Sequence, residues 1–510
     1  MKIPQEILDV LAVLEKASPP TSGRTGERTG GFKAYLVGGC VRDILLNQKP
    51  KDWDITTNAK PEEIGSIFGK SGYKTFYENK FGTVSVVTHS KDETFPPKAD
   101  QPRAEKTVEI TPFRKEAKYS DKRHPDNVSF SVSLEEDLKR RDFTINALAL
   151  KVKNHEMIDL FGGQKDLKNK IIRAVGRPEE RFDEDALRIM RAFRFSAELG
   201  FSIEEKTKKA LEQKKGLLEM IAKERIRDEL IKIIMSPAPD KALEEMRELG
   251  VLKYVLPELE EGFGVTQNKH HIYTVWEHNL KALMHAVQKN WPLDIRLASL
   301  FHDLGKPRTK VGEGPDSTFY NHEVVSAKMT AQILFRLCFP KKTAEKIIKL
   351  VRWHLFFSDT EVITLSAVRR IIRNVEPENI WDLMKLRFTD RVGMGRPKER
   401  PFRLRKYEAM VEQALRDPIS VSMLKINGRD IMEIAGLEPG PKIGYILHAL
   451  LEEVLDEPKK NNKNYLIQRV KELAALSDNE LEKLGKSAKE KKESLEEEEV
   501  GKIYQKYWVK

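Results

Sequence analysis

The chain has 510 residues, only two of which are cysteine, and it carries a formal net charge of +11 at pH 7. This length predicts several domains, and two distant cysteines exclude a disulfide framework and a cysteine-rich zinc site. No segment approaches the roughly 18 consecutive apolar residues of a membrane-spanning helix. Residues 1–16 are typical of an amphipathic helix rather than a signal peptide. We therefore expect a cytoplasmic protein whose positive charge suits a polyanionic partner.

The N-terminal third of the chain alternates between predicted strands and helices. Residues 17–31, rich in Gly, Ser, Thr and Pro, predict a flexible linker before it. Residues 90–105 predict a mobile hairpin or insertion within it. The predicted strands are 33–37, 52–57, 82–89 and 106–113, and the predicted helices are 40–47 and 60–70.

The rest of the chain is predicted to be helical. From about residue 134 the apolar residues recur with a period near 3.6, almost to the end. From residue 479 a run of Lys and Glu predicts either a solvated helix or a disordered tail. The fold class we expect is α+β: a small α/β head with a mixed sheet, followed by an elongated all-α body.

Three carboxylates fall on the predicted strands of the head. Asp52 and Asp54 are two residues apart, so both side chains are expected on one face. Two such carboxylates repel each other unless a cation lies between them, and Mg²⁺ prefers oxygen ligands of this kind. Glu109 is expected opposite Val108 and Ile110, which face the core. Such a set can hold the metal ions of a phosphoryl transfer.

A glycine pair precedes the first predicted helix. Gly38 and Gly39 lie between a strand and a helix, where free backbone N–H groups and the helix dipole favour an anion. Arg42, on the first turn of that helix, can pair with a phosphate through two hydrogen bonds.

These motifs together resemble the bacterial tRNA nucleotidyltransferase and poly(A) polymerase superfamily. The resemblance begins with LVGGCVRD (36–43) and KDWDITT (51–57). It continues, in the order of the family, through VEITPFR (108–114), YSDKRHPDNVSF (119–130), LKRRDFTINALAL (138–150), DLFGGQKDL (159–167), residues 172–201 and KERIRDEL (223–230).

The resemblance implies a role for each matching residue. Asp52, Asp54 and Glu109 match the catalytic metal-binding carboxylates. Gly38, Gly39 and Arg42 match the turn that contacts the triphosphate. The motif RRDFTINA, associated with ribose and nucleotide binding, contributes Arg141, Asp142 and Asn146.

A second cluster surrounds residues 184–194. Asp185 and Arg188 are three apart, which on a helix places them on one face within reach of one planar ligand. Arg191 and Arg194 extend a basic line from Arg188. Taken alone, this pattern is typical of a salt-bridged surface helix. The family resemblance implies instead that this segment reads the incoming base.

The chemistry of such a base reader is simple. A carboxylate accepts from the amino group of cytosine or adenine, while a guanidinium donates to a ring acceptor. Uracil and guanine direct a carbonyl at the carboxylate, and each mismatch leaves a desolvated group unpaired, at a cost of about 1–3 kcal/mol.

Histidines and aspartates around a His-Asp pair form a third cluster. Their order resembles the HD phosphohydrolase superfamily, and their chemistry suits a divalent transition metal. The resemblance implies phosphatase or cyclic phosphodiesterase activity on terminal phosphates, and a role confined to holding RNA also remains open. The predicted ligands are His278, His302, Asp303, His322, His354 and Asp390.

The function expected from these resemblances is template-independent addition of CCA to the 3′ end of tRNA, from CTP and ATP with Mg²⁺. A poly(A) polymerase and a CC-adding or A-adding enzyme share the head motifs. A rival of another class is an HD-type RNA-end phosphohydrolase with an inactive head. Residues 422–458 resemble the C-terminal segment of the bacterial CCA-adding enzymes and are expected to contact the tRNA body. No protein partner is identifiable.

The domain organisation expected from these motifs has six parts. They are an N-terminal extension and linker (1–30), the nucleotidyltransferase head (31–155), a helical neck (156–262), the HD domain (263–405), a C-terminal helical region (406–478) and a charged tail (479–510).

Overall fold

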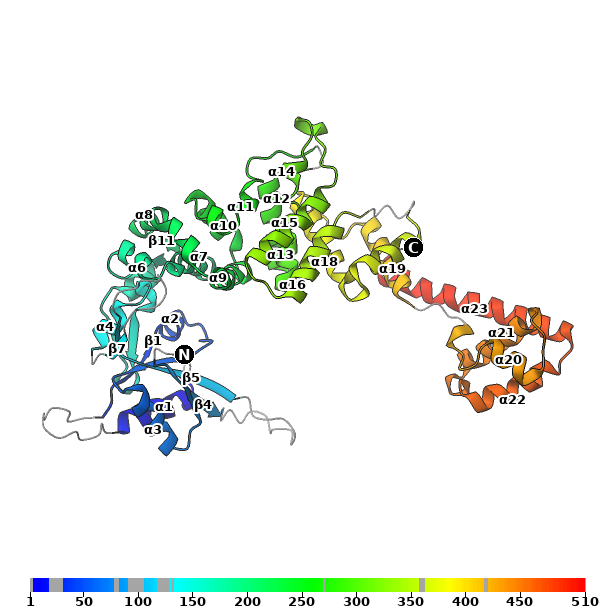
Figure 1. Cartoon of the computed structure of the whole chain (residues 1–510), viewed down its shortest axis with the longest axis horizontal. Coiled ribbons are helices and arrows are strands. Elements are labelled where there is room, and N and C mark those ends of the chain that lie inside the picture. The colour runs from blue at the N-terminus through cyan, green and yellow to red at the C-terminus, as the bar shows by residue number, and fades with distance from the viewer. Residues whose placement is uncertain are drawn as a thin grey trace. The chain divides into compact units, whose positions relative to one another are not determined.

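A computed structural model describes residues 3–17, 31–77, 82–89, 105–116, 128–130, 133–268, 271–356, 363–416 and 421–509. The chain divides into two compact units, Met1–Ile348 and Lys349–Lys510 (Figure 1). Nearly all of the predicted linker at 17–31 and of the predicted insertion at 90–105 lies outside the described residues. Among the described residues, no helix is both long enough and apolar enough to cross a membrane.

The sheet of the head is mixed, as predicted, and it has seven strands among the described residues. Its order is β3-β4-β5-β2-β1-β8-β9, and β2 and β5 run parallel while the other neighbours are antiparallel. The strands are β1 (Ala34–Val37), β2 (Asp54–Thr57), β3 (Thr75–Tyr77), β4 (Val84–His89), β5 (Glu105–Pro112), β8 (Leu148–Lys151) and β9 (Glu156–Asp159).

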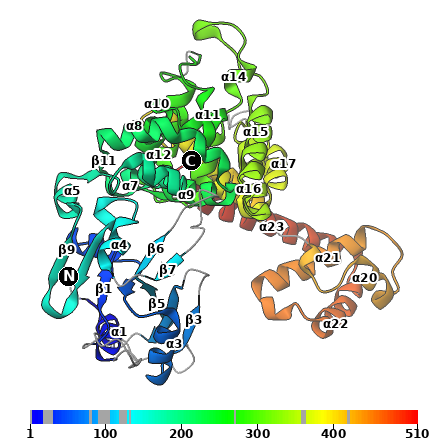
Figure 2. The ribbon, with the colours of Figure 1, turned by 60° about the vertical axis from the view of Figure 1, so that its left-hand side comes forward.

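Of the residues predicted to face the core of the sheet, Trp53 is only half-buried, whereas the three on β2 and β5 are buried. Ile55, Val108 and Ile110 are at most 1% exposed. Burying each such side chain contributes about 1.5–3 kcal/mol, which pins the register of β2 against β5. Helices α1 (Gln5–Lys16) and α3 (Pro61–Lys70) lie side by side against the sheet (Figures 1 and 2), and α2 (Gly39–Leu45) packs on β1 and β8.

Strands β8 and β9 correct the prediction that the chain is helical from residue 134. Leu148, Ala149 and Leu150 are all buried, so β8 is a short continuous apolar run without the alternation that marks a half-buried strand. Such a run is indistinguishable from a buried helix segment by periodicity. The missed strands complete the sheet, because β8 pairs with β1 and β9 pairs with β8.

Besides β8 and β9, the described residues between 114 and 260 form two short strand pairs and a series of helices. The pairs are β6 (Arg114–Glu116) with β7 (Val128–Phe130) and β10 (Ile171–Ile172) with β11 (Ser202–Ile203). The helices are α4 (Leu134–Lys139), α5 (Gly163–Asn169), α6 (Pro178–Glu184), α7 (Leu187–Leu199), α8 (Glu205–Lys214), α9 (Lys223–Met235), α10 (Pro239–Glu248) and α11 (Pro257–Glu260). Helix α7 packs on α9, and this contact fixes one wall of the site described below.

The remainder of the first unit is helical. Thr274 caps the first of these helices, and Glu277 completes a capping box that satisfies its free N–H groups. The helices are α12 (Val275–Gln288), α13 (Leu293–Phe301), α14 (Lys306–Thr309), α15 (His322–Arg336) and the start of α16 (Lys341–Trp353).

The described part of the second unit is also helical. The stretch GLEPGP (436–441) connects α20 (Gly428–Ala435) to α21 (Pro441–Asp456). The predicted charged tail is the helix α23, in which Leu481 and Ile503 are buried, so the alternative of a disordered tail is wrong (Figure 2). The helices are α17 (Leu365–Val375), α18 (Ile380–Gly393), α19 (Phe402–Leu415), α20 (Gly428–Ala435), α21 (Pro441–Asp456), α22 (Lys463–Ala474) and α23 (Asp478–Lys506).

Candidate active site

A cavity of about 1030 Å³ lies between the sheet of the head and helices α7 and α9. Among the described residues that line it, basic side chains outnumber acidic ones by eleven to six. Such an excess of positive charge in a hollow attracts a polyanion. The lining includes all the predicted site residues of the head and neck except Glu109.

The predicted catalytic carboxylates lie at the start of β2 and beside it. Asp54 pairs in register with Glu109 on the neighbouring parallel strand, so their side chains share one face of the sheet. Asp52 lies in the bend that precedes β2 rather than inside the strand as predicted, and it is exposed. Burial raises the pKa of Asp54, Arg141 counters this rise, and the charge of Asp52 adds to it. A divalent cation would relieve that repulsion, so these carboxylates fit a metal.

The glycine turn is shaped by a close approach of Arg141. Gly38 has φ +74°, which favours glycine, and a Cβ atom there would lie 2.8 Å from Nη1 of Arg141. Arg42 follows on α2, where its Nη1 donates to Oδ1 of Asn146 at 2.9 Å and its Nη2 lies 2.7 Å from Oδ1 of Asp43. The turn, Arg42 and the RRDFTINA motif therefore lie in contact with one another.

Asp142 links the head to helix α7. Its Oδ2 accepts from Nε of Arg191 at 2.7 Å, and its Oδ1 accepts from Nδ2 of Asn146 at 3.1 Å. Burial alone would raise the pKa of Asp142, but the charge and hydrogen bonds of Arg191 outweigh burial and lower it to about 2. Arg42, Asn146, Asp142 and Arg191 thus form one connected chain of polar contacts.

Asp185 and Arg188 do not share a helical face, contrary to the prediction. Asp185 ends α6 in an extended conformation (φ −136°, ψ 103°), and α7 begins two residues later. Its Oδ1 accepts from the backbone N–H of Leu187 at 3.1 Å, a local bond that competes with helix formation. Arg225 of α9 pairs with its Oδ2 at 3.3 Å.

Arg188, which follows the break between α6 and α7, is fixed by hydrogen bonds to two residues that precede this break. Its Nη1 donates to Oε2 of Glu184 at 2.6 Å, and its Nη2 donates to the backbone oxygen of Arg140 at 2.9 Å. Asp185 and Arg188 nevertheless both line the cavity. The structure therefore brings the predicted base-reading pair together by a break between helices rather than by helical spacing.

Sequence reasoning did not single out three residues of this region: Asp137, Phe195 and Arg225. Asp137 is fully buried and accepts from Arg140 at 2.7 Å and from Arg141 at 3.4 Å. Arg225 lies in KERIRDEL, which carried the resemblance, but its pairing with Asp185 depends on the packing of α9 on α7. Phe195 reads as an ordinary core residue of an amphipathic helix.

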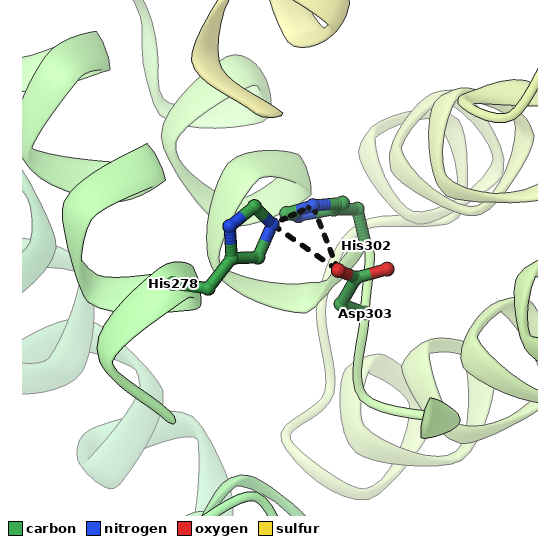
Figure 3. Close-up of side chains that lie close together, drawn as sticks. All are labelled: His278, His302 and Asp303. Atoms are coloured by element: carbon green, nitrogen blue, oxygen red, sulfur yellow. Dashed lines mark hydrogen bonds and ion pairs between the residues drawn. The ribbon is translucent and has the colours of Figure 1, made fainter. Parts of the chain in front are cut away.

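The His-Asp cluster lies at the ends of three helices of the first unit. His278 of α12 and His302 after α13 direct Nε2 at Oδ2 of Asp303, at 3.1 and 3.4 Å (Figure 3). His322 at the start of α15 places its Nε2 3.2 Å from Oδ1. Lys306 places its Nζ 2.6 Å from Oδ2. Burial would raise the pKa of Asp303, but Lys306 and the histidines hold it well below its usual range.

Hydrogen bonds at the other ring nitrogens prepare these histidines to bind a metal. Nδ1 of His302 lies 2.9 Å from the backbone oxygen of Ser299, and Nδ1 of His322 lies 2.7 Å from that of Phe319. Donation by Nδ1 leaves the Nε2 lone pair available as a ligand. Nε2 of His278 and of His302 are only 2.9 Å apart, so a shared cation suits them. These residues therefore fit a divalent metal.

The other two predicted ligands belong to the second unit. His354 is buried just after α16, and its Nδ1 lies 2.7 Å from the backbone oxygen of Val351. Asp390 is buried in α18 and pairs with Arg387 at 2.5 Å.

Comparison with known families matches three parts of the chain. Residues 34–173 match "Poly A polymerase head domain", residues 200–263 match "Probable RNA and SrmB- binding site of polymerase A", and residues 275–402 match "HD domain". A CCA-adding enzyme of Ligilactobacillus salivarius is 34% identical over 92% of this chain and 98% of its own length. The chain belongs to the CCA-adding enzyme family.

One similar protein is named for the addition of a single kind of nucleotide. An A-adding tRNA nucleotidyltransferase of Deinococcus radiodurans is 35% identical over 82% of this chain and 91% of its own length. Among solved structures, the CCA-adding enzyme of Bacillus stearothermophilus in complex with CTP aligns with a TM-score of 0.58 and 28% identity, covering 92% of this chain and 98% of that one. The similarity to this family thus extends over most of the chain.

Proposed function

We propose that this protein adds CCA to the 3′ end of tRNA, taking the nucleotides from CTP and ATP. The observation that carries the proposal is the pairing of Asp54 with Glu109 beside a basic cavity that also contains Asp185 and Arg188. A catalytically inactive head would not need to keep a partly buried carboxylate next to a second acidic group, because each negative charge makes ionisation of the other less favourable. This argues against the rival in which only the HD domain is active.

The reaction transfers a nucleotide without a covalent enzyme intermediate. The terminal 3′-hydroxyl oxygen of the tRNA attacks the α-phosphorus, the bond to the β-phosphate oxygen breaks, and pyrophosphate leaves. A divalent metal held by Asp52, Asp54 and Glu109, which we propose to be Mg²⁺, would supply charge neutralisation at the phosphate. Arg42, Arg191 and Arg194 bind the phosphates.

The remaining residues orient the nucleotide. Arg141, Asp142 and Asn146 lie between the carboxylates and α7, where a ribose would lie between the phosphates and the base. Asp185 accepts from the exocyclic amino group of cytosine or adenine, and Arg188 donates to a ring acceptor. Since Arg225 donates to both oxygens of Asp185, at 3.4 and 3.3 Å, it fixes the plane of that carboxylate.

A narrower product remains a second candidate, because one relative of similar identity is named an A-adding enzyme. For the HD domain we propose hydrolysis of terminal phosphates at a divalent transition metal, supported by the convergence of histidines on Asp303. We also propose a cytoplasmic location, with which two free cysteines, one of them buried, are compatible.

The test uses three tRNA substrates, ending at the discriminator base, after one C and after two Cs. Each is incubated with CTP, ATP or both, and the 3′ ends are sequenced. CCA addition predicts that the shortest substrate gains two Cs with CTP alone and is completed with both nucleotides. Products that gain only A, or that carry long A tails, would contradict the proposal. Asp54→Ala is expected to lower transfer by about a thousandfold or more while tRNA binding persists.

A further inference from the structure

Three arginines of the cavity surround one aromatic ring. The Cζ atoms of Arg194, Arg42 and Arg191 lie 4.1, 5.3 and 5.4 Å from the ring centroid of Phe195. Each distance lies within the roughly 6 Å over which a guanidinium is attracted to the face of a ring. Arg42 comes from α2 of the head, whereas the other two lie on α7, so the ring joins cations from two parts of the chain.

The ring itself is fixed in place. Phe195 is 3% exposed, and it packs edge-to-face on Phe143, with centroids 5.7 Å apart and an interplanar angle of 83°. Phe143 directly follows Asp142, the carboxylate that pairs with Arg191. The position of the ring is therefore tied to the motif that lines the cavity.

The three guanidinium groups need such support because like charges repel. Each has an acidic partner: Asp43 for Arg42 at 2.7 Å, Asp142 for Arg191, and Glu229 for Arg194 at 3.3 Å. These three carboxylates lie on different parts of the fold, and each of them is paired here with only one of the three arginines. Phe195 is a neighbour common to all three, and the negative face of its ring attracts cations without neutralising them.

We propose that Phe195 is a positioning residue that holds Arg42, Arg191 and Arg194 as one anion-binding set for the phosphates of the incoming nucleoside triphosphate. The inference rests on the proposed transferase function and adds to it a residue that touches no reacting atom. An arginine free to change rotamer loses entropy when it binds a phosphate, and an arginine already packed on a ring has lost most of it. Without the ring, the cations remain but bind phosphate less tightly.

The experiment separates the electrostatic role of the ring from its packing role. Phe195→Leu removes the aromatic face, and a series of increasingly fluorinated phenylalanines at the same position keeps the shape while weakening the negative face. The dissociation constants of CTP and of inorganic tripolyphosphate are measured by calorimetry in the absence of divalent metal. We expect Phe195→Leu to bind both about tenfold more weakly, and the fluorinated series to lose affinity stepwise.

The matched control is Phe193→Leu. Phe193 lies on the same helix and is fully buried, so this variant should lower the melting temperature without changing the affinity for tripolyphosphate. Affinities that are unchanged across the fluorinated series would overturn the proposal, and so would a loss confined to tRNA binding. If the wild type extends no tRNA while fluorination still weakens tripolyphosphate binding, the proposed function fails and the role of Phe195 stands.

Discussion

At the residue scale, many of the charged side chains that line the cavity are paired with one another, and these pairs fix the groups that are proposed to bind the nucleotide. Asp142 shows this most clearly, because it is 8% exposed and bonds to both Arg191 and Asn146. Its carboxylate fixes two side chains that are proposed to meet the nucleotide. A buried charge with such partners also makes the folded state sensitive to acid.

The pKa of Asp142 leads to a stability prediction. Its folded value of about 2 lies below the ordinary value of 3.8, so the stabilisation is complete above pH of about 4 and is lost as the pH falls towards about 2. The contribution is on the order of 2 kcal/mol. In Asp142→Asn this contribution is missing at every pH. The difference in unfolding free energy between the wild type and this variant, measured by urea denaturation, should therefore shrink through that window. A difference that stays constant with pH would contradict the pairing.

Asp185 makes a prediction about selectivity. Asp185→Ala leaves Arg188 able to donate but removes the acceptor for the base amino group. The ratio of kcat/KM for CTP to that for UTP should then fall by roughly 5- to 150-fold, corresponding to about 1–3 kcal/mol. Transfer of every nucleotide should also slow, because the α-phosphate is positioned through the base. Steady-state kinetics on a tRNA ending at the discriminator base measure both effects.

The matched control for base selection is Asp183→Ala. Asp183 lies two residues earlier, and its partly exposed side chain pairs with Lys214 at 2.6 Å. Its removal should leave the CTP-to-UTP ratio at the wild-type value. A wild-type ratio in Asp185→Ala as well would mean that selection lies elsewhere in the cavity.

At the element scale, the sequence predicted best those elements whose signals are local. β1, β2 and α3 lie within two residues of their predicted bounds, because a β-branched run or a capped amphipathic segment carries its own signal. β8 was missed because a short buried run lacks a period, and the four residues of β9, none of them buried, are too few to show an alternation. The break at Asp185 was missed because an aspartate that caps a backbone N–H is read equally well as a helix residue.

In the candidate site, too, residues with a local sequence signal were predicted and residues whose role depends on tertiary contacts were not. The carboxylates, the glycine turn and the arginines were found from motifs. The roles of Phe195 and Arg225 depend on residues that are distant in sequence and on the packing of α7 against α2 and α9. No local pattern reports such a contact.

Helix α23 makes a stability prediction for the second unit. Its first turn packs Leu481 into the buried cluster of α20, α21 and α22, and its last turn places Ile503 in a second cluster that includes Ala409 of α19. Leu481→Ala should therefore destabilise this unit by about 2–5 kcal/mol. Leu484→Ala, at a position 41% exposed on the same helix, should cost less than about 0.5 kcal/mol. Hydrogen exchange of residues 421–509 measures both, and equal effects would mean that α23 does not support the core.

At the scale of the whole molecule, the two proposed metal sites are built from different elements. The transferase carboxylates come from β2, β5 and the bend before β2, whereas the described ligands of the HD site in the first unit come from α12, the residues just after α13, and α15. The donors also differ in kind, with oxygen at the first site and mainly imidazole nitrogen at the second. Different metals should therefore occupy the two sites.

The last prediction tests whether the two sites act independently. Asp303→Asn removes the charge on which His278, His302 and His322 converge, so metal analysis of the purified protein should show loss of bound transition metal. Incorporation of CMP into tRNA should continue at close to the wild-type rate, because His278, His302, His322 and Lys306, which pair with Asp303, do not line the transferase cavity. Circular dichroism of the same sample controls for folding, since Lys306 loses a charged partner in this variant. Loss of CMP incorporation in a folded Asp303→Asn protein would show that the HD site supports the transferase reaction.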